Sequence, residues 1–294
     1  MSEVKSDPHM QEFSVPQVIR SLDLEQLDRD FFVGDPGVAK GRLFGGLVAG
    51  QSVVAAGRTV GEGAVLHSLH AYFLRPGSYG KPIRFTVDRI RDGRTFTTRR
   101  VVALQAGEAI FNLSASFATP EESFEHQEPM PDVPRPEGLP EMSEVRARMF
   151  KQPPPKEIIT GTLEMRVVDD PTQPGCDTAL DPQRNIWMRL NGKPPEDPLL
   201  RTALLVYASD RSLLGTALKP TGRNPGGNIM MASLDHCLWL HHPPALDDWF
   251  LYSSQSPLSH AGRALVHGAM YAPDGTRIAS VTQEGLIRER RAKP

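Results

Sequence analysis

The sequence predicts an α+β fold in which one unit occurs twice, each time as a long helix followed by an antiparallel β-sheet that wraps it. Helical patterns at residues 41–60 and 199–218 each precede a series of segments with strand-like alternation. A proline-rich stretch at residues 119–157 separates the two series. One unit of roughly 110 residues that occurs twice explains this order better than two unrelated domains.

The first half begins with a short amphipathic element within residues 15–30 and a short buried strand at residues 31–33. The helix predicted at residues 41–60, GRLFGGLVAGQSVVAAGRTV, presents small residues at helical spacing. An interior glycine costs about 1 kcal/mol relative to alanine, so we expect close backbone approach on that face, to a sheet wrapped around the helix. Gly45 and Gly46 leave two interpretations open, because their amide N–H groups could instead face a ligand oxygen.

Strand signals follow this helix. Residues 66–77 and 81–93 alternate between apolar and polar side chains, and the second segment ends in the hairpin signal Asp92-Gly93. Residues 95–117 are predicted to form two more strands, with the turn at Ala106-Gly107.

The composition changes at residues 119–157, where nine prolines stand among many acidic residues. This pattern is typical of a linker or an extended arm, here with a short helix over residues 141–150. We therefore divide the chain into a first unit at residues 13–118, the linker, and a second unit at residues 158–290.

The second half repeats the plan of the first. Strands are predicted at residues 161–170 and 184–192, before the helix at residues 199–218. A glycine-rich loop follows at residues 221–228. Four further strands are predicted after it, at residues 231–243, 249–257, 262–276 and 277–288.

One carboxylate stands near the middle of the second predicted helix. The helix is apolar on almost every side, and Arg201 and Asp210 interrupt it, so it is shorter than the ~20 apolar residues of a membrane span. Burying a carboxylate costs several kcal/mol of free energy unless the group is paired, and burial raises the pKa of the carboxylate. Asp210 is therefore either an ion-paired structural residue or a working base.

The overall composition fits a globular protein with a small net charge. The chain has 294 residues and a net charge of −2, which predicts no binding to nucleic acid and no attraction to an anionic membrane. Two cysteines, Cys176 and Cys237, fit a reducing compartment. The first residues lack the apolar core of a signal peptide, so we expect a cytoplasmic protein without membrane insertion.

Six segments of the chain resemble the type II acyl-CoA thioesterase family of bacteria and peroxisomes. They are LFGGLVAGQ, LHSLHAYFLRPG, DGRTFTTRRV, YASDRSLL, SLDHCLWLHHP and VTQEGLIR. The resemblance implies a double hotdog fold and hydrolysis of fatty acyl-CoA thioesters to free acid and coenzyme A. It implies no metal site and no organic cofactor.

The resemblance also implies a catalytic Asp on the second helix, a Ser or Thr on the next strand and a Gln on the last strand. These positions are Asp210, Ser233 and Gln283 in this chain. A carboxylate beside a hydroxyl and an amide can hold and deprotonate one water molecule. Direct attack by the carboxylate through an anhydride remains an alternative.

Three further residues are predicted to contact the substrate. Backbone N–H groups of Gly45 and Gly46 are candidates for stabilising the oxyanion, supplied across the interface between the two hotdog units. His67 is expected near the substrate channel or at a contact between subunits.

Two other sites are disfavoured. Ser233, Asp235 and His236 suggest a hydrolase triad, but Ser233 and His236 would point to opposite faces of one strand, and the chain has no G-x-S-x-G motif. The histidine pairs His67 with His70 and His241 with His242 lack a third metal ligand at a useful spacing.

Two other functions are weighed against the thioesterase. A hotdog enoyl-CoA hydratase usually has an Asp and a His a few residues apart, whereas Arg211-Ser212-Leu213-Leu214-Gly215 follows Asp210. A non-catalytic acyl-CoA-binding protein is the second alternative. Because hotdog sheets commonly pair edge to edge, we expect a homodimer or a higher homo-oligomer.

Overall fold

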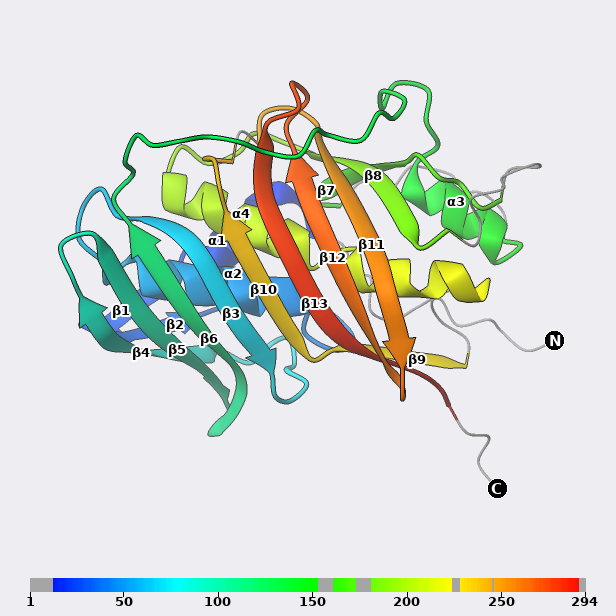
Figure 1. Ribbon diagram of the computed structural model, residues 1–294. Helices are drawn as coiled ribbons and strands as arrows, with labels where there is room; N and C mark the ends of the chain where they lie inside the picture. Colours follow the sequence, from blue (N-terminus) through cyan, green and yellow to red (C-terminus); the bar gives the residue numbers. More distant parts are fainter. Residues whose placement is uncertain (1–12, 153–160, 173–180, 224–227, 245, 291–294) are drawn as a thin grey trace.

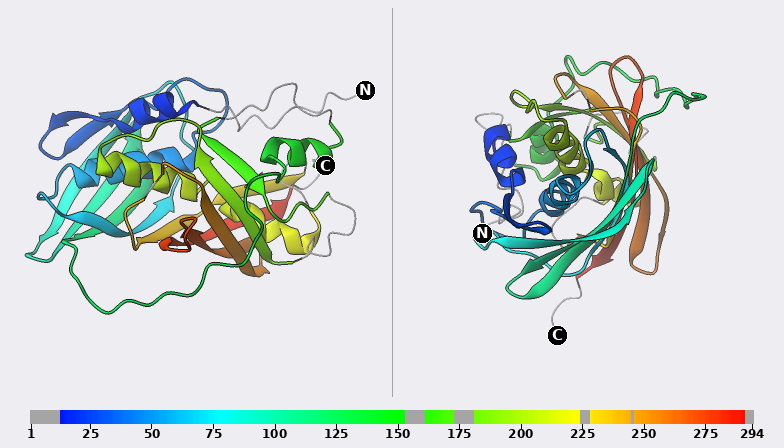
Figure 2. Two further views of the ribbon diagram at one scale, coloured as in Figure 1. Left: turned by 90° about the horizontal axis from the view of Figure 1, so that it is seen from above. Right: turned by 90° about the vertical axis from the view of Figure 1, so that its left-hand side faces the viewer.

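The structure is a computed structural model that describes residues 13–152, 161–172, 181–223, 228–244 and 246–290. Within these residues, one 13-stranded antiparallel sheet curls around two long helices, α2 and α4 (Figures 1 and 2). The helices are α1 (Val15–Leu22), α2 (Gly45–Gly57), α3 (Met142–Met149) and α4 (Pro198–Ser209), followed by the 3-10 helix η2 (Leu213–Thr221).

The strands of the first half form one side of the sheet, in the order β1-β2-β4-β5-β6-β3. The strands of the second half continue it as β10-β13-β12-β11-β8-β7, and β9 pairs with β13. Their bounds are β1 Glu25–Asp28, β2 Phe31–Gly34, β3 Val65–Phe73, β4 Ile83–Asp92, β5 Phe96–Gln105, β6 Glu108–Ala118, β7 Leu163–Val167, β8 Gln183–Leu190, β9 Ile229–Ser233, β10 Asp235–Leu240, β11 Phe250–His260, β12 Arg263–Tyr271 and β13 Arg277–Glu289. The pairing of β3 with β10 joins the two halves, with Leu69 opposite Leu238.

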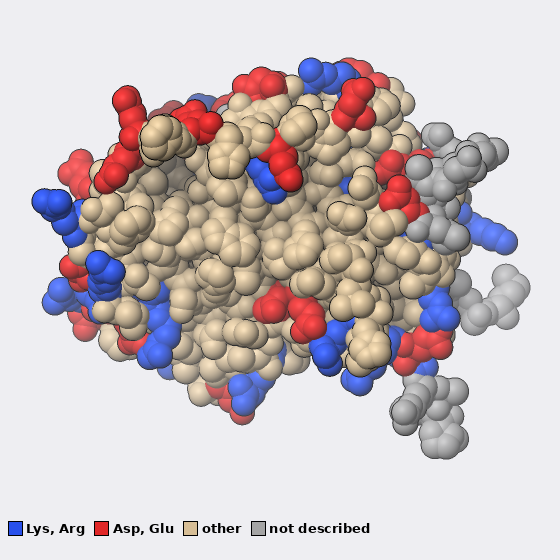
Figure 3. All heavy atoms as spheres, in the orientation of Figure 1, with Lys and Arg blue, Asp and Glu red and all other residues tan. Residues whose placement is uncertain are grey.

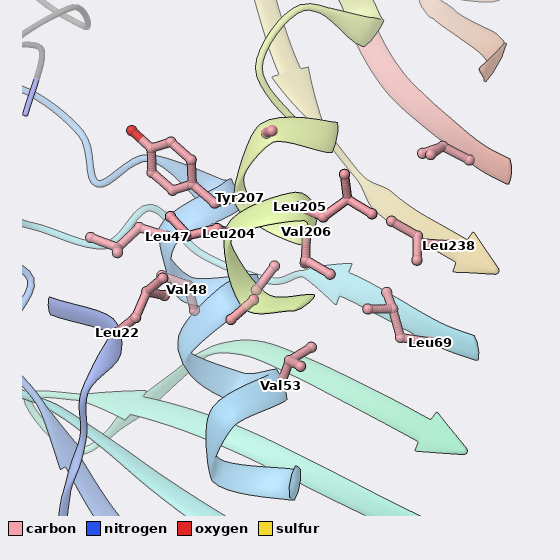
Figure 4. Close-up of a cluster of buried hydrophobic side chains, with 14 of the residues drawn as sticks. Leu22, Leu47, Val48, Val53, Leu69, Leu204, Leu205, Val206, Tyr207 and Leu238 are labelled. Atoms are coloured by element: carbon pink, nitrogen blue, oxygen red, sulfur yellow. The ribbon is translucent and has the colours of Figure 1, made fainter. Parts of the chain in front are cut away.

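The core lies between the concave face of the sheet and the helices. Figure 4 shows the side chains of α2 and α4 meeting each other and those of β3 and β10, among them Val53, Leu205 and Leu69. Both helices are apolar around almost their whole circumference, because the sheet covers one side of them and other helices cover the rest.

The small residues of α2 allow the backbone of another element to approach closely, and that element is the helix α4. A Cβ atom on Gly50 would lie 2.9 Å from the carbonyl oxygen of Ala203 in α4, and one on Gly46 would lie 2.6 Å from that of Tyr207. The sequence led us to expect this approach from the sheet. The nearest backbone belongs instead to the helix of the other half.

Two predicted elements close to Asp210 are interrupted. The helix predicted over residues 199–218 ends at Ser209, and η2 follows it, because Asp210 is the C-cap and its carboxylate bonds outside the helix. The strand predicted over residues 231–243 is interrupted at Leu234, whose N–H donates to Glu284 and whose carbonyl accepts from Phe73.

The middle of the linker, around residues 130–139, lies against the outer face of the sheet. The indole of Trp187 donates a hydrogen bond to the carbonyl of Pro134, at 2.8 Å, and Leu139 packs against the apolar cluster that contains Trp187. The predicted short helix is present as α3, capped by Glu141. Residues 224–227 of the predicted glycine-rich loop, and Cys176, lie outside the described residues. Nowhere in the described part of the chain is a helix both long and apolar enough to span a membrane.

We predict that Gly50→Ala destabilises the protein by about 1–3 kcal/mol, because overpacking against a backbone carbonyl outweighs the ~1 kcal/mol gain in helix propensity. Urea unfolding of the variant measures this loss. Gly61→Ala is the control, since a Cβ there meets nothing within 4 Å. Equal unfolding midpoints for both variants and the wild type would contradict the tight contact between α2 and α4.

Candidate active site

The end of α4 meets the start of α2, and one carboxylate lies between them. Asp210 is the C-cap residue of α4, and its carboxylate accepts a hydrogen bond from the backbone N–H of Gly46 in the first turn of α2. A helix N-terminus carries partial positive charge, so α2 stabilises the negative charge of Asp210. The carboxylate comes from one half of the chain and the helix terminus from the other.

Neither glycine at the start of α2 leaves room for a side chain. A Cβ on Gly45 would lie 2.8 Å from Asp210 Oδ2 and 2.5 Å from the ring of Phe73. At Gly46 the carbonyl of Tyr207 occupies the corresponding position, at 2.6 Å. Of the two alternatives that the sequence left open for this pair, close packing is present, and the amide of Gly46 faces the carboxylate of Asp210. A contact of these glycines with substrate stays a prediction.

Two polar side chains converge on the same oxygen of Asp210. Gln283 Nε2 in β13 donates to Oδ1 at 2.7 Å, and Ser233 Oγ at the end of β9 donates to Oδ1 at 3.4 Å. The pairing of β9 with β13, which sets Ser233 opposite Gly285, brings the two donors to one side of the carboxylate. The three residues that the resemblance singled out are thus neighbours.

A fourth side chain, His236 in β10, lies behind Gln283. It is fully buried, its Nδ1 is 3.1 Å from Gln283 Nε2, and its Nε2 is 2.8 Å from Ser209 Oγ. From the sequence, His236 is only a disfavoured triad partner of Ser233. In the structure its hydrogen bonds go to Gln283 and Ser209. The signal that could have found this role is the alternation of His236 with buried Leu238 on the inner face of β10.

The electrostatics of the two titratable groups follow from their burial. Burial raises the pKa of Asp210 to about 6, against the lowering effects of hydrogen bonds from Gln283, Ser233 and Gly46 and of the nearby Arg211. Burial lowers the pKa of His236 to about 4. At neutral pH the site therefore holds an ionised carboxylate and a neutral imidazole.

A cavity of about 470 Å³ opens beside Asp210. Much of its wall is apolar and rich in methionine, with side chains from α3, β7, η2 and β9. These are Met142, Val145, Met149, Phe150, Met165, Val167, Leu214 and Met231. Arg146, Arg184, Lys219 and Arg223 add positive charge to the lining. The cavity can take a long apolar group next to the carboxylate.

His67 lies apart from this cluster. Its Nε2 is 2.8 Å from Ser116 Oγ of the neighbouring strand β6, and its ring packs against Phe96. No hydrogen bond among the described residues links it to Asp210, and its predicted contact with substrate remains untested. The described residues also contain no group of three or more His, Cys, Asp or Glu side chains arranged to hold a metal ion.

Two family models match the chain. The model described as acyl-CoA thioesterase matches residues 167–286, and the model described as acyl-CoA thioesterase N-terminal domain matches residues 35–118. A mouse protein named acyl-coenzyme A thioesterase 8 is 38% identical over 91% of this chain and 87% of its own length. Acyl-CoA thioesterase 2 of Haemophilus influenzae is 35% identical over 92% of this chain and 96% of its own length.

Solved structures give the same picture. An acyl-CoA thioesterase II from Mycobacterium marinum is 37% identical, with a TM-score of 0.78 over 95% of this chain and 99% of that one. A protein with a hot dog fold from Alicyclobacillus acidocaldarius has a TM-score of 0.75 at 18% identity, over 92% of this chain and 98% of that one. The second likeness shows the fold alone.

We predict that Asp210→Asn stabilises the protein at neutral and alkaline pH. A pKa of about 6, above the ordinary 3.8, means that the folded state binds this proton more tightly than the unfolded state. The wild type therefore loses stability as the pH rises from about 4 to about 6, whereas a neutral amide has no such loss.

Denaturant unfolding at several pH values measures the effect. The midpoint of Asp210→Asn should exceed that of the wild type at pH 8, and the difference should shrink towards pH 4. Asp132→Asn, at an exposed position of the linker, is the control and should leave the pH dependence unchanged. A constant difference at all pH values would contradict the raised pKa.

Proposed function

Because the chain belongs to the acyl-CoA thioesterase family and is a thioester hydrolase, we propose that Asp210, Ser233 and Gln283 bind and activate the water that attacks the acyl-CoA carbonyl. The observation that carries this proposal is the convergence of Ser233 Oγ and Gln283 Nε2 on one oxygen of Asp210. The adjacent cavity supports it, since an acyl chain there would lie next to the carboxylate.

In the proposed reaction the Asp210 carboxylate takes a proton from water, and the oxygen of that water bonds to the thioester carbon. The carbonyl oxygen becomes an oxyanion, the C–S bond then breaks, and coenzyme A leaves as a thiolate. A base with a pKa of about 6 is ionised at neutral pH and is still basic enough to accept a proton. The hydrogen bonds that hold its oxygens favour a base over a direct nucleophile.

The substrate contacts follow from the same geometry. We assign the methionine-rich wall of the cavity to the acyl chain, because thioether side chains adapt to apolar groups of irregular shape. The positive N-terminus of α2 at Gly45 and Gly46 is suited to an oxyanion as well as to Asp210. The cationic side chains of the lining are suited to the phosphates of coenzyme A.

We also propose that the chain consists of two hotdog units, at residues 13–118 and 158–290, joined by the linker. Three observations support this: each half supplies one side of the sheet, each contributes one of the two enclosed helices, and separate family models match the two halves.

Self-association is proposed as well. Figure 3 shows a broad area with few charged side chains on the outer face of the sheet, over β3, β10 and β13. Tyr72, which is 59% exposed, and Trp239, packed against His70, lie on these strands. Depletion of charge together with aromatic side chains is typical of subunit interfaces, which supports a homo-oligomer. The free thiol of Cys237 is consistent with the expected cytoplasmic location.

We predict that Asp210→Ala folds but loses at least about 100-fold in kcat, the usual contribution of a general base. Release of free thiol from a saturated acyl-CoA, followed with a chromogenic disulfide, measures the rate. The kcat/KM of the wild type should rise with pH through about 6, the pKa of Asp210, and the residual rate of the variant should lack this rise.

Asp235→Asn is the matched control, because this nearby carboxylate accepts a hydrogen bond from the backbone N–H of Glu284 and does not bond Asp210. Turnover by Asp210→Ala equal to that of the wild type would remove this carboxylate from the mechanism. Absence of thiol release with hydration of an enoyl-CoA would instead favour a hydratase. Binding without either reaction would favour an acyl-CoA-binding protein.

A further inference from the structure

The proposed water mechanism leaves one buried histidine of the site without a role. We propose that His236 is a positioning residue, whose neutral imidazole locks the side-chain amide of Gln283 so that an amide N–H always faces Asp210. The inference rests on the proposed role of Asp210. It concerns a residue that touches neither water nor substrate and acts through Gln283.

The direction of the hydrogen bonds follows from a count of protons. Ser209 Oγ has one proton and donates it to the carbonyl of Val206 at 2.8 Å. Its contact of 2.8 Å with His236 Nε2 therefore requires that Nε2 carries the proton. A neutral imidazole protonated at Nε2 has a lone pair at Nδ1, which accepts from Gln283 Nε2 at 3.1 Å.

This arrangement uses both amide protons of Gln283, so its carbonyl oxygen is the atom left to accept a hydrogen bond from the proposed water. One proton goes to His236 Nδ1 and the other to Asp210 Oδ1, at 3.1 Å and 2.7 Å. Rotation of the amide by half a turn would place its oxygen 2.7 Å from a carboxylate oxygen, and two acceptors at that distance repel each other. Protonation of Nδ1 would favour that rotated amide, so the protonation state of His236 determines which amide atom Asp210 meets.

The surroundings keep the imidazole neutral and fixed. His236, Ser209 and Gln283 are each fully buried, and burial lowers the pKa of His236 to about 4. The hydroxyl of Tyr252 donates to the carbonyl of Ser209 at 2.8 Å and holds that residue from the far side. Hydrogen bonds thus run from the Ser209 hydroxyl through His236 and Gln283 to Asp210, and Tyr252 in β11 bonds the backbone of Ser209.

Two substitutions at position 236 separate positioning from bulk. His236→Leu fills similar space but offers no hydrogen-bond acceptor. We expect its kcat to fall about 10- to 100-fold, as for a misplaced catalytic group. Its KM for acyl-CoA should change less than about threefold. His236→Asn presents an amide oxygen close to the position of Nδ1, and it should recover most of kcat. Failure of the Asn variant to exceed the Leu variant would overturn the proposal.

A double variant tests whether His236 acts only through Gln283. Gln283→Leu alone should lose activity, and adding His236→Leu should cause no further loss in kcat, because the group to be positioned is already gone. Independent, multiplying losses would overturn the proposal. Failure of this inference can be distinguished from failure of the proposed function. If Asp210→Ala is inactive while His236→Leu is fully active, only the positioning role of His236 is rejected.

Ser209→Ala provides a test if His236→Leu does not fold, which thermal unfolding reveals. Loss of this hydroxyl leaves His236 Nε2 without its acceptor and frees the tautomer, so kcat should fall several-fold at an unchanged KM. Ser52→Ala is the matched control, since Ser52 is equally buried and its hydroxyl also bonds a carbonyl of its own helix, that of Val48 in α2. Equal kcat in both serine variants and the wild type would overturn the proposal.

Discussion

The contact between the Asp210 carboxylate and the first turn of α2 links the placement of the carboxylate to the packing of the two central helices. It excludes a side chain at Gly45, where the carboxylate and Phe73 fill the space. It also requires the backbones of the two helices to approach closely, which explains the small residues at Gly46 and Gly50. The packing of the two core helices and the placement of the carboxylate therefore depend on each other.

The cost of burying that carboxylate is met by directed hydrogen bonds. Desolvation raises the pKa of Asp210, and three hydrogen bonds with a nearby guanidinium lower it. The resulting pKa is about 6. For the proposed role as a base, a fully stabilised carboxylate would be too weak, and an unsupported one would be protonated at neutral pH. Gln283 can support Asp210 only if its own amide is oriented, and that requirement extends the network to His236 and Ser209.

Much of this arrangement could be predicted from local sequence patterns. The alternation of the strands, the Asp92-Gly93 and Ala106-Gly107 turns and the small-residue helix all depend on neighbours in sequence, and the structure has strands and a helix at those places. The choice of Asp210, Ser233 and Gln283 came from the resemblance to a family. Nothing in the periodicity alone distinguishes Ser233 from any other serine in a strand.

The parts that sequence reasoning missed depend on long-range contacts. The end of α4 at Ser209 is set by partners of Asp210 on α2 and β13, and the interruption at Leu234 by hydrogen bonds to Phe73 and Glu284. Because the sequence does not reveal this interruption, the role of His236 could be judged only from its spacing to Ser233 along one predicted strand. The wall that α3 adds to the cavity likewise depends on the path of the linker.

The two halves of the chain contribute unlike parts to the site. The second half supplies Asp210, Ser233, Gln283 and His236, and the first supplies the N-terminus of α2. Without the first half the carboxylate would lose the positive end of a helix and the backbone N–H of Gly46. Without the second half, the small residues of α2 would have no helix to pack against. A covalent linker keeps these unlike partners at a fixed ratio of one to one, which a free association of two similar units would not ensure.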